Sequence, residues 1–168
     1  MHARRMSLVA GTVLALALAS GCGSSSKSNA SGSTTTSGGT VVHVNLVDTK
    51  GLNGPMKLIA DKSTVPAGKV TFIIKNTGTI EHELVVLKMT GNEAWNTMPV
   101  TYAGDPPAPV NSGGDKVSEA NDELDTGSNL APGTTRTMSG TLAAGSYALV
   151  CNIAKHYGLG MRAGLTVS

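Results

Sequence analysis

The stretch Gly145-Ser-Tyr-Ala-Leu-Val-Cys-Asn-Ile-Ala-Lys-His-Tyr-Gly-Leu-Gly-Met161 decides how this chain of 168 residues is interpreted. Its first half is rich in aromatic and aliphatic residues and predicts a strand that enters a loop. Residues 161–167, Met-Arg-Ala-Gly-Leu-Thr-Val, predict the strand that leaves the same loop. The segment therefore indicates a β-hairpin whose connecting loop contains several side chains able to bind a metal.

Cys151, His156 and Met161 occur in this loop as Cys-x4-His-x4-Met. On a helix, side chains five positions apart would be rotated by about 140° and could not converge. They can converge if the loop curls around one point, and Gly158 and Gly160 permit this because glycine tolerates positive φ and close backbone approach. The loop therefore predicts a metal site. The alternative is a buried structural cysteine beside an unrelated histidine and methionine.

His82 lies far upstream, in the apolar run Glu81-His-Glu-Leu-Val-Val-Leu87. Because residues two apart share a face of a strand, His82 is expected on the same face as Leu84 and Val86. A single histidine on such a face is usually an ordinary core residue. Together with the Cys-His-Met loop, however, it completes the ligand set of a His2Cys copper centre with a weak axial methionine. Such a site satisfies both Cu(I) and Cu(II), which predicts one-electron transfer.

Two segments carry a resemblance to a known family: Val70-Thr-Phe-Ile-Ile-Lys-Asn-Thr-Gly-Thr-Ile-Glu-His-Glu-Leu84 and Tyr147-Ala-Leu-Val-Cys-Asn-Ile-Ala-Lys-His-Tyr-Gly-Leu-Gly-Met161. Over residues 41–168 the chain resembles the cupredoxins, the small type 1 blue-copper proteins. The resemblance implies a Greek-key β-sandwich that binds one mononuclear copper ion. The implied ligands are His82, Cys151 and His156 in a trigonal plane and Met161 in the axial position. It also implies that His82 is buried and that an edge of His156 reaches the surface as the electron port.

The chain departs from the family pattern at two positions. Many cupredoxins carry Asn directly after the first histidine ligand, where this chain has Glu83, and related sequences often have a small residue where it has Lys155. The first departure leaves the hydrogen bonding around the cysteine loop open. Asn76 and Asn152 are candidate hydrogen-bond donors near the site, or else ordinary turn and strand-end residues.

The whole domain is predicted to be all-β. Short β-rich runs alternate with Gly, Pro, Asn and Asp turn signals, which is typical of a sandwich. The predicted strands cover residues 41–47, 56–60, 69–76, 81–88, 134–142, 145–152 and 161–167. His43 is expected to be a plain strand residue, and no pair of histidines suggests a second copper of a catalytic kind.

Residues 89–130 form a long polar insertion between the His82 strand and the Cys151 hairpin. A short helical turn is expected over residues 92–97, and Met89 and Met98 are expected to be packing or surface residues. Loops of this length are usually functional or poorly ordered. The acidic group is interpreted as solvated surface, or alternatively as a docking surface for a basic redox partner; its members are Asp115, Glu119, Asp122, Glu123 and Asp125.

The N-terminal region predicts export and lipid attachment. Residues 1–22 combine a basic start with a short apolar run, too short to cross a bilayer, and resemble a bacterial lipoprotein signal peptide with Cys22 as the lipidated residue. Residues 23–40 are mostly Ser, Gly and Thr and predict a flexible tether to a domain at 41–168. A disulfide between Cys22 and Cys151 is not expected, since each cysteine has a separate role.

Charge and ligand set together limit the functions to consider. The formal net charge of +2 falls towards zero without the leader, so no nucleic-acid partner is expected. The sequence predicts a monomeric electron carrier on the extracytoplasmic face of the bacterial cell membrane, working with redox protein partners. The alternative is copper binding for storage or delivery; an enzyme is not expected.

Overall fold

Alternation of buried and exposed residues builds the first sheet. In β1 the residues at 42, 44, 46 and 48 are buried while those between them are more exposed, because successive side chains of a strand point to opposite faces. β1 pairs in parallel with β4 and antiparallel with β2. The sheet has the order β10-β4-β1-β2 and consists of β1 (Thr40–Asp48), β2 (Met56–Ala60), β4 (Gly68–Asn76) and β10 (Thr135–Leu142).

The predicted hairpin forms the centre of the second sheet. β11 and β12 pair antiparallel from Gly145↔Val167 to Val150↔Arg162, with the loop of interest between them. β5 pairs with the other edge of β11, and β9 extends the sheet beyond β5. The order is β3-β12-β11-β5-β9, with β3 (Thr64–Val65), β5 (Val85–Lys88), β9 (Asp122–Asp125), β11 (Gly145–Val150) and β12 (Arg162–Val167).

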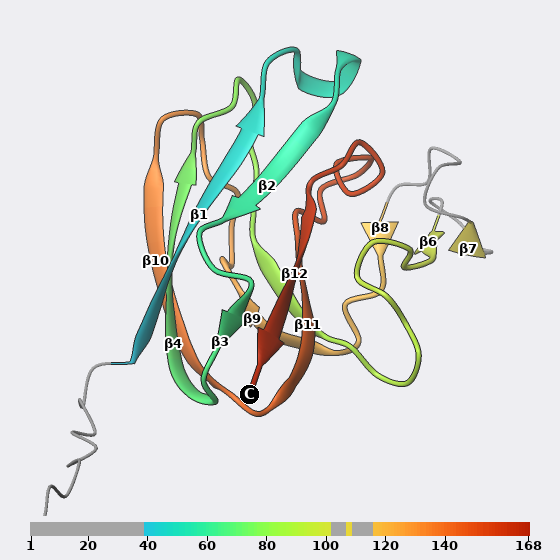
Figure 1. Cartoon of the computed structure of the whole chain (residues 1–168). Coiled ribbons are helices and arrows are strands. Elements are labelled where there is room, and N and C mark those ends of the chain that lie inside the picture. Colours follow the sequence, from blue (N-terminus) through green and yellow to red (C-terminus); the bar gives the residue numbers. More distant parts are fainter. Residues whose placement is uncertain (1–38, 102–106, 109–115) are drawn as a thin grey trace, which may run out of the picture. The chain divides into compact units, whose positions relative to one another are not determined.

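The two sheets face each other, as Figure 1 shows, and enclose the main core. β1 and β4 contribute Val44 and Phe72 from one side, and β5 and β11 contribute Val86 and Leu149 from the other. Burying large apolar side chains in this way supplies the main driving force for folding. The predicted all-β sandwich is confirmed, and Cys151 lies at one end of this core.

The insertion covers the outer face of the second sheet with a second, smaller core. Val85 and Val150 of the sheet pack there with Met98, Val100 and Val117 of the insertion. This explains why β5 is buried on both faces. The insertion also contains three short strands in the order β7-β6-β8, namely β6 (Val100–Thr101), β7 (Pro107–Ala108) and β8 (Lys116–Val117). Residues 92–97 form turns rather than a helix.

Most predicted strands agree with the structure to within two residues, but the strand at 81–88 was predicted too long. β5 begins only at Val85, and His82 forms an isolated bridge with Leu130. The backbone N–H groups between them have other partners, because Glu83 donates to Cys151 Sγ and Leu84 to Thr126 Oγ1. The predicted faces are nevertheless right, since Leu84 and Val86 join the main core while Val85 joins the second.

The computed structural model describes residues 39–101, 107–108 and 116–168. The predicted signal peptide, Cys22, most of the tether and Asp115 lie outside these residues. In the described part, the helical element is the 3-10 turn η1 (Gly51–Asn53), and no helix there has the length and apolar character needed to cross a membrane. The other members of the acidic group defined above are exposed: Glu119, Asp122, Glu123 and Asp125.

Candidate metal centre

Three sequence-distant side chains meet at the end of the sandwich. His82 is held by the bridge to Leu130, where His82 N–H donates to Leu130 O at 3.1 Å and Leu130 N–H donates back at 2.6 Å. Cys151 follows the last residue of β11, and His156 lies in the loop before β12. Together, His82, Cys151 and His156 form the one potential metal-binding group of His, Cys and acidic residues in the described part of the chain.

The ligand atoms of these residues form a tight triangle. His82 Nδ1 lies 3.1 Å from His156 Nδ1. Cys151 Sγ lies 3.2 Å from His156 Nδ1 and 3.9 Å from His82 Nδ1. A point equidistant from the three atoms would be about 2.0 Å from each, close to the ~2.0–2.3 Å bonds that a zinc ion makes with imidazole and thiolate. Two imidazoles and one thiolate at this spacing fit one mononuclear copper ion.

Burial shapes the protonation of these groups. It raises the pKa of the Cys151 thiol to about 12, although backbone N–H groups of Glu83 and Ile153 act in the opposite direction. Burial and the neighbouring His82 lower the pKa of His156 to about 4, against an opposing effect of Asp48. The metal-free site therefore holds a neutral thiol and a neutral His156 imidazole at neutral pH. A metal must displace the thiol proton when it binds.

The loop curls as the spacing predicts, with one difference. Gly160 has φ +112°, and a Cβ there would meet the Met56 carbonyl oxygen at 2.6 Å, so this position requires glycine. The second left-handed residue is Lys155, with φ +74°, rather than the expected Gly158. A glycine at the Lys155 position would avoid the strain that a side chain experiences in this conformation.

Met161 is fully buried beside the cluster and belongs to the main core. Its backbone joins the other two residues of the motif, because Met161 N–H donates to His156 O at 3.0 Å and Cys151 N–H donates to Met161 O at 3.1 Å. These bonds close the Cys-x4-His-x4-Met loop on itself. The thioether as axial ligand stays a prediction.

One expectation about the loop is wrong. His156 was expected to present an edge at the surface, yet its exposed fraction is 2%. Its ring turns inward, edge-on to His82 with ring centroids 5.0 Å apart. The loop also folds towards β2, where Met56 N–H donates to Leu159 O at 2.9 Å. His82 is buried, as expected.

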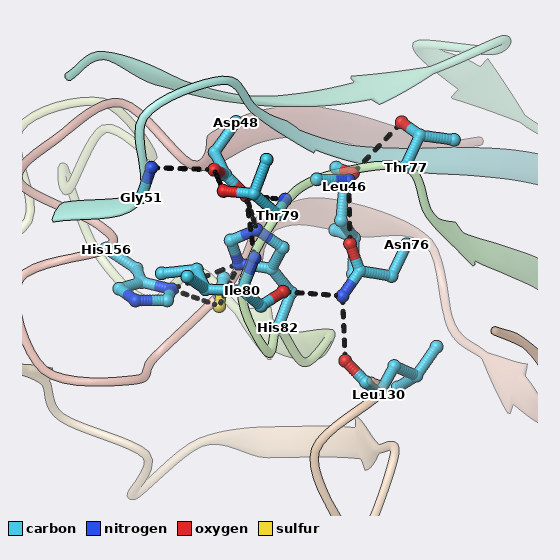
Figure 2. A network of polar contacts seen from close by, with 12 residues as sticks. Leu46, Asp48, Gly51, Asn76, Thr77, Thr79, Ile80, His82, Leu130 and His156 are labelled. Carbon is cyan, nitrogen blue, oxygen red and sulfur yellow. Dashed lines mark hydrogen bonds and ion pairs between the residues drawn. The ribbon is translucent and has the colours of Figure 1, made fainter. Parts of the chain in front are cut away.

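A buried carboxylate that sequence reasoning missed completes the site. Asp48, the last residue of β1, places Oδ2 at 2.8 Å from His82 Nε2, with both side chains fully buried (Figure 2). Burial alone would raise the pKa of Asp48, but hydrogen bonds from Thr79, His82 and the Gly51 backbone hold that pKa well below its usual range. The predicted strand stopped at residue 47; one more step of the inward alternation would have placed residue 48 on the core face.

Asn76 organises the turn that supplies the backbone N–H and the hydroxyl of Thr79, both of which donate to Asp48. Its amide donates to the carbonyls of Ile80 and Leu130 at 2.8 and 2.7 Å, while its oxygen accepts from Gly78 N–H at 2.8 Å. The turn then aims Thr79 at Asp48 (Figure 2). Asn76 is therefore a structural residue of the site rather than a donor to the cysteine.

Glu83 contributes to the cysteine environment through its backbone. Its N–H donates to Cys151 Sγ at 3.4 Å. Burial raises the pKa of the Glu83 carboxyl, nearby Asp125 and Glu119 raise it further, and Lys116 and the Asn152 backbone N–H oppose the rise.

Asn152 joins the ligand loop to the insertion. It accepts from Val117 N–H at 2.8 Å and donates to Val117 O at 3.0 Å, and it also donates to Glu119 at 2.5 Å. Asn152 is thus a hydrogen-bond donor beside the site, and the groups that accept from it lie in the insertion. The insertion is therefore hydrogen-bonded to Asn152, the residue that directly follows the candidate ligand Cys151.

Comparison with known proteins gives only structural neighbours. No family model matches the chain, and neither does any curated protein. The chain is similar to reduced auracyanin from Roseiflexus castenholzii, at 28% identity over 75% of this chain and 96% of that one, with a TM-score of 0.47. Auracyanin A, a "blue" copper protein from Chloroflexus aurantiacus, has 24% identity over 76% and 99%, with a TM-score of 0.45. Rusticyanin from Thiobacillus ferrooxidans has 22% identity over 78% and 79%, with a TM-score of 0.42.

The assignment follows from the fold and the site rather than from these scores. The two mixed sheets face each other, and the hairpin of β11 and β12 presents a cysteine and a histidine to a histidine that precedes β5. The donor atoms converge at a spacing that fits one copper ion. The described domain therefore has a cupredoxin-like β-sandwich fold, with a site that fits one mononuclear copper ion.

Proposed function

We propose that this protein is a type 1 copper protein that carries single electrons between redox partners. The observation that carries the proposal is the convergence of His82 Nδ1, His156 Nδ1 and Cys151 Sγ within 3.1 to 3.9 Å in a buried pocket. When bound, copper would supply a one-electron couple between Cu(II) and Cu(I). His82, Cys151 and His156 would hold it, and the Met161 thioether would be a further, weaker ligand.

The burial of the candidate ligands favours a copper ion that stays bound to the protein over one that is passed to another molecule. Cys151 and His156 have exposed fractions of 0% and 2%, so an acceptor molecule would have to open the loop to reach the ligands. The backbone bonds between Met161 and both neighbours oppose that opening. These features support an electron carrier rather than copper storage or delivery, and the proposal assigns no catalytic residue.

Voltammetry combined with a chelator challenge tests the carrier against the alternative. A carrier gives a reversible one-electron wave and keeps Cu(I) for hours in the presence of a competing chelator. Rapid loss of Cu(I) without a reversible wave would favour delivery. A Cys151→Ser variant is the matched control, since it changes one atom and removes the thiolate.

We also propose that the protein is anchored by a lipid on Cys22 at the extracytoplasmic face of a bacterial cell membrane. The basic and apolar leader ending in Ser-Gly-Cys22 supports this location, and the Ser/Gly/Thr segment after it would let the copper domain reach redox partners. Mass spectrometry of the protein purified from membranes tests the anchor. Attached diacylglycerol on Cys22, and release of a Cys22→Ala variant from the membrane, are the expected results.

A further inference from the structure

Asp48 is a buried carboxylate with an unusually complete set of donors. Its exposed fraction is 3%. The Gly51 and Thr79 backbone N–H groups donate at 2.8 and 2.7 Å, and the Thr79 hydroxyl donates at 2.5 Å. The Ile80 N–H lies further away, at 3.4 Å. These groups fix the carboxylate on the backbone of two loops, independently of the histidine.

The contact between Asp48 and His82 sets the hydrogen-bonding role of each ring nitrogen. An ionised carboxylate accepts hydrogen bonds and donates none, so His82 Nε2 must carry the proton of the 2.8 Å bond. The other nitrogen, Nδ1, then faces Cys151 and His156 with its lone pair available. A free imidazole would divide its proton between the two nitrogens, and only one of these forms can bind a metal through Nδ1.

Close packing at Gly78 shows that the contact between Asp48 and His82 depends on the backbone around it. A Cβ at Gly78 would collide with Asp48 Oδ2 and would lie 2.7 Å from His82 Nε2. Gly78 itself is held in place by its N–H bond to Asn76. The absence of a side chain at Gly78 therefore lets the carboxylate and the imidazole edge approach each other.

We propose that Asp48 is the positioning residue of the copper site: it holds His82 in the tautomer that presents Nδ1 to the metal, and its negative charge lowers the reduction potential. This inference rests on the proposed copper function. A carboxylate behind a ligating histidine orients the ring and raises its basicity, and losing such a group typically weakens metal binding about 10- to 100-fold. A nearby buried anion also favours the more positive, oxidised metal ion.

The first experiment needs no copper. Long-range proton–nitrogen NMR of the metal-free full chain, labelled on histidine nitrogen, identifies the protonated nitrogen of His82. At about pH 8 the expected result is a proton on Nε2 and none on Nδ1. A proton on Nδ1 of the wild-type protein would overturn the proposal. This result stands whether or not copper binds, so it separates this inference from the proposed function.

The second experiment compares Asp48→Asn with Asp61→Asn. Asp61 is a matched control, because its carboxylate also accepts from a backbone N–H, that of His43 at 2.8 Å, but lies at the surface. Asp48→Asn should weaken copper affinity about 10- to 100-fold. It should also raise the potential enough to shift the ratio of reduced to oxidised protein at least tenfold, or about 59 mV for one electron. Asp61→Asn should change neither. Equal affinities and potentials in the two variants would overturn the proposal.

Discussion

The hydroxyl of Tyr157 donates a hydrogen bond to the Trp95 carbonyl at 2.7 Å and accepts one from Met98 N–H at 3.0 Å. Tyr157 directly follows the candidate ligand His156, and its ring is also covered by Arg162, whose guanidinium lies 5.0 Å from the ring centroid. The insertion is thus bonded to the ligand loop beside His156, as it is beside Cys151 through Asn152. We infer that the insertion braces the loop in its metal-binding shape.

Replacing Tyr157 with Phe should loosen this brace. The change leaves the Met98 N–H and the Trp95 carbonyl without their partner, which should cost about 1–3 kcal/mol in the free energy of unfolding. Urea denaturation measures this loss, and the copper spectrum should broaden as the loop samples more geometries.

Tyr147→Phe is the matched control for that change. Tyr147 is equally buried and donates to the Ala143 carbonyl at 2.8 Å, but its hydroxyl does not contact the ligand loop. This variant should lose stability and keep the wild-type copper spectrum. Identical spectra in both variants would argue against a brace.

Replacing Met161 with Leu should keep the intense colour and raise the reduction potential. The weak thioether donor stabilises Cu(II) more than Cu(I), so its loss favours the reduced state. A rise of about 59 mV or more, a tenfold shift for one electron, is expected by voltammetry. Met138→Leu, in β10, is the control and should leave the potential unchanged. An unaltered potential in the Met161 variant would show that Met161 is not a ligand.

The metal-free protein should lose stability in alkali through Cys151. The folded thiol has a pKa of about 12, raised from 9.0 by burial. Above about pH 9 the unfolded chain releases this proton while the folded chain keeps it, so unfolding becomes easier by about 1.4 kcal/mol per pH unit until the folded thiol ionises. Denaturation curves between these limits measure the slope. A Cys151→Ser variant should have a slope smaller by this amount; equal slopes would contradict the shifted pKa.

A redox partner should dock near η1, where Leu52 has an exposed fraction of 51%. The backbone N–H of Gly51, next to Leu52, donates to Asp48, and Asp48 in turn contacts His82. Leu52 therefore lies near the end of the sandwich that carries the candidate metal centre. Leu52→Asp should slow electron exchange between copper-loaded molecules and leave the visible spectrum intact. Ile59→Asp is the control, since Ile59 is 49% exposed but lies near the opposite end of β2 from Met56, the residue that pairs with Asp48. Equal rates in the two variants would exclude the Leu52 surface.

Local patterns were sufficient to predict the hairpin and the meeting of its cysteine and histidine with His82. The Cys-x4-His-x4-Met motif lies between two strands that are recognisable from their own residues, and the alternation around His82 gave the correct face. These features depend on neighbours in the sequence. The sandwich could be predicted for the same reason, because most of its longer strands alternate or contain apolar runs.

Features set by distant packing were not predictable in this way. Asp48 meets His82 across 34 positions, and its donors come from two loops whose path the sequence does not reveal. The second core depends on pairs such as Val100 and Val117, which sit in strands of two residues and show no periodicity. The burial of His156 likewise depends on where the rest of its loop packs.

Visible and EPR spectra of the Cu(II)-loaded protein, followed by ascorbate, test the central claim most directly. One copper per chain should give an intense thiolate-to-copper band and a narrow copper hyperfine splitting, and both should disappear on reduction. Cys151→Ser should abolish the band, and His82→Ala should leave a weak and distorted site. A copper-loaded wild-type protein without the band, or a His82→Ala variant with unchanged spectra, would contradict a centre built from His82, Cys151 and His156.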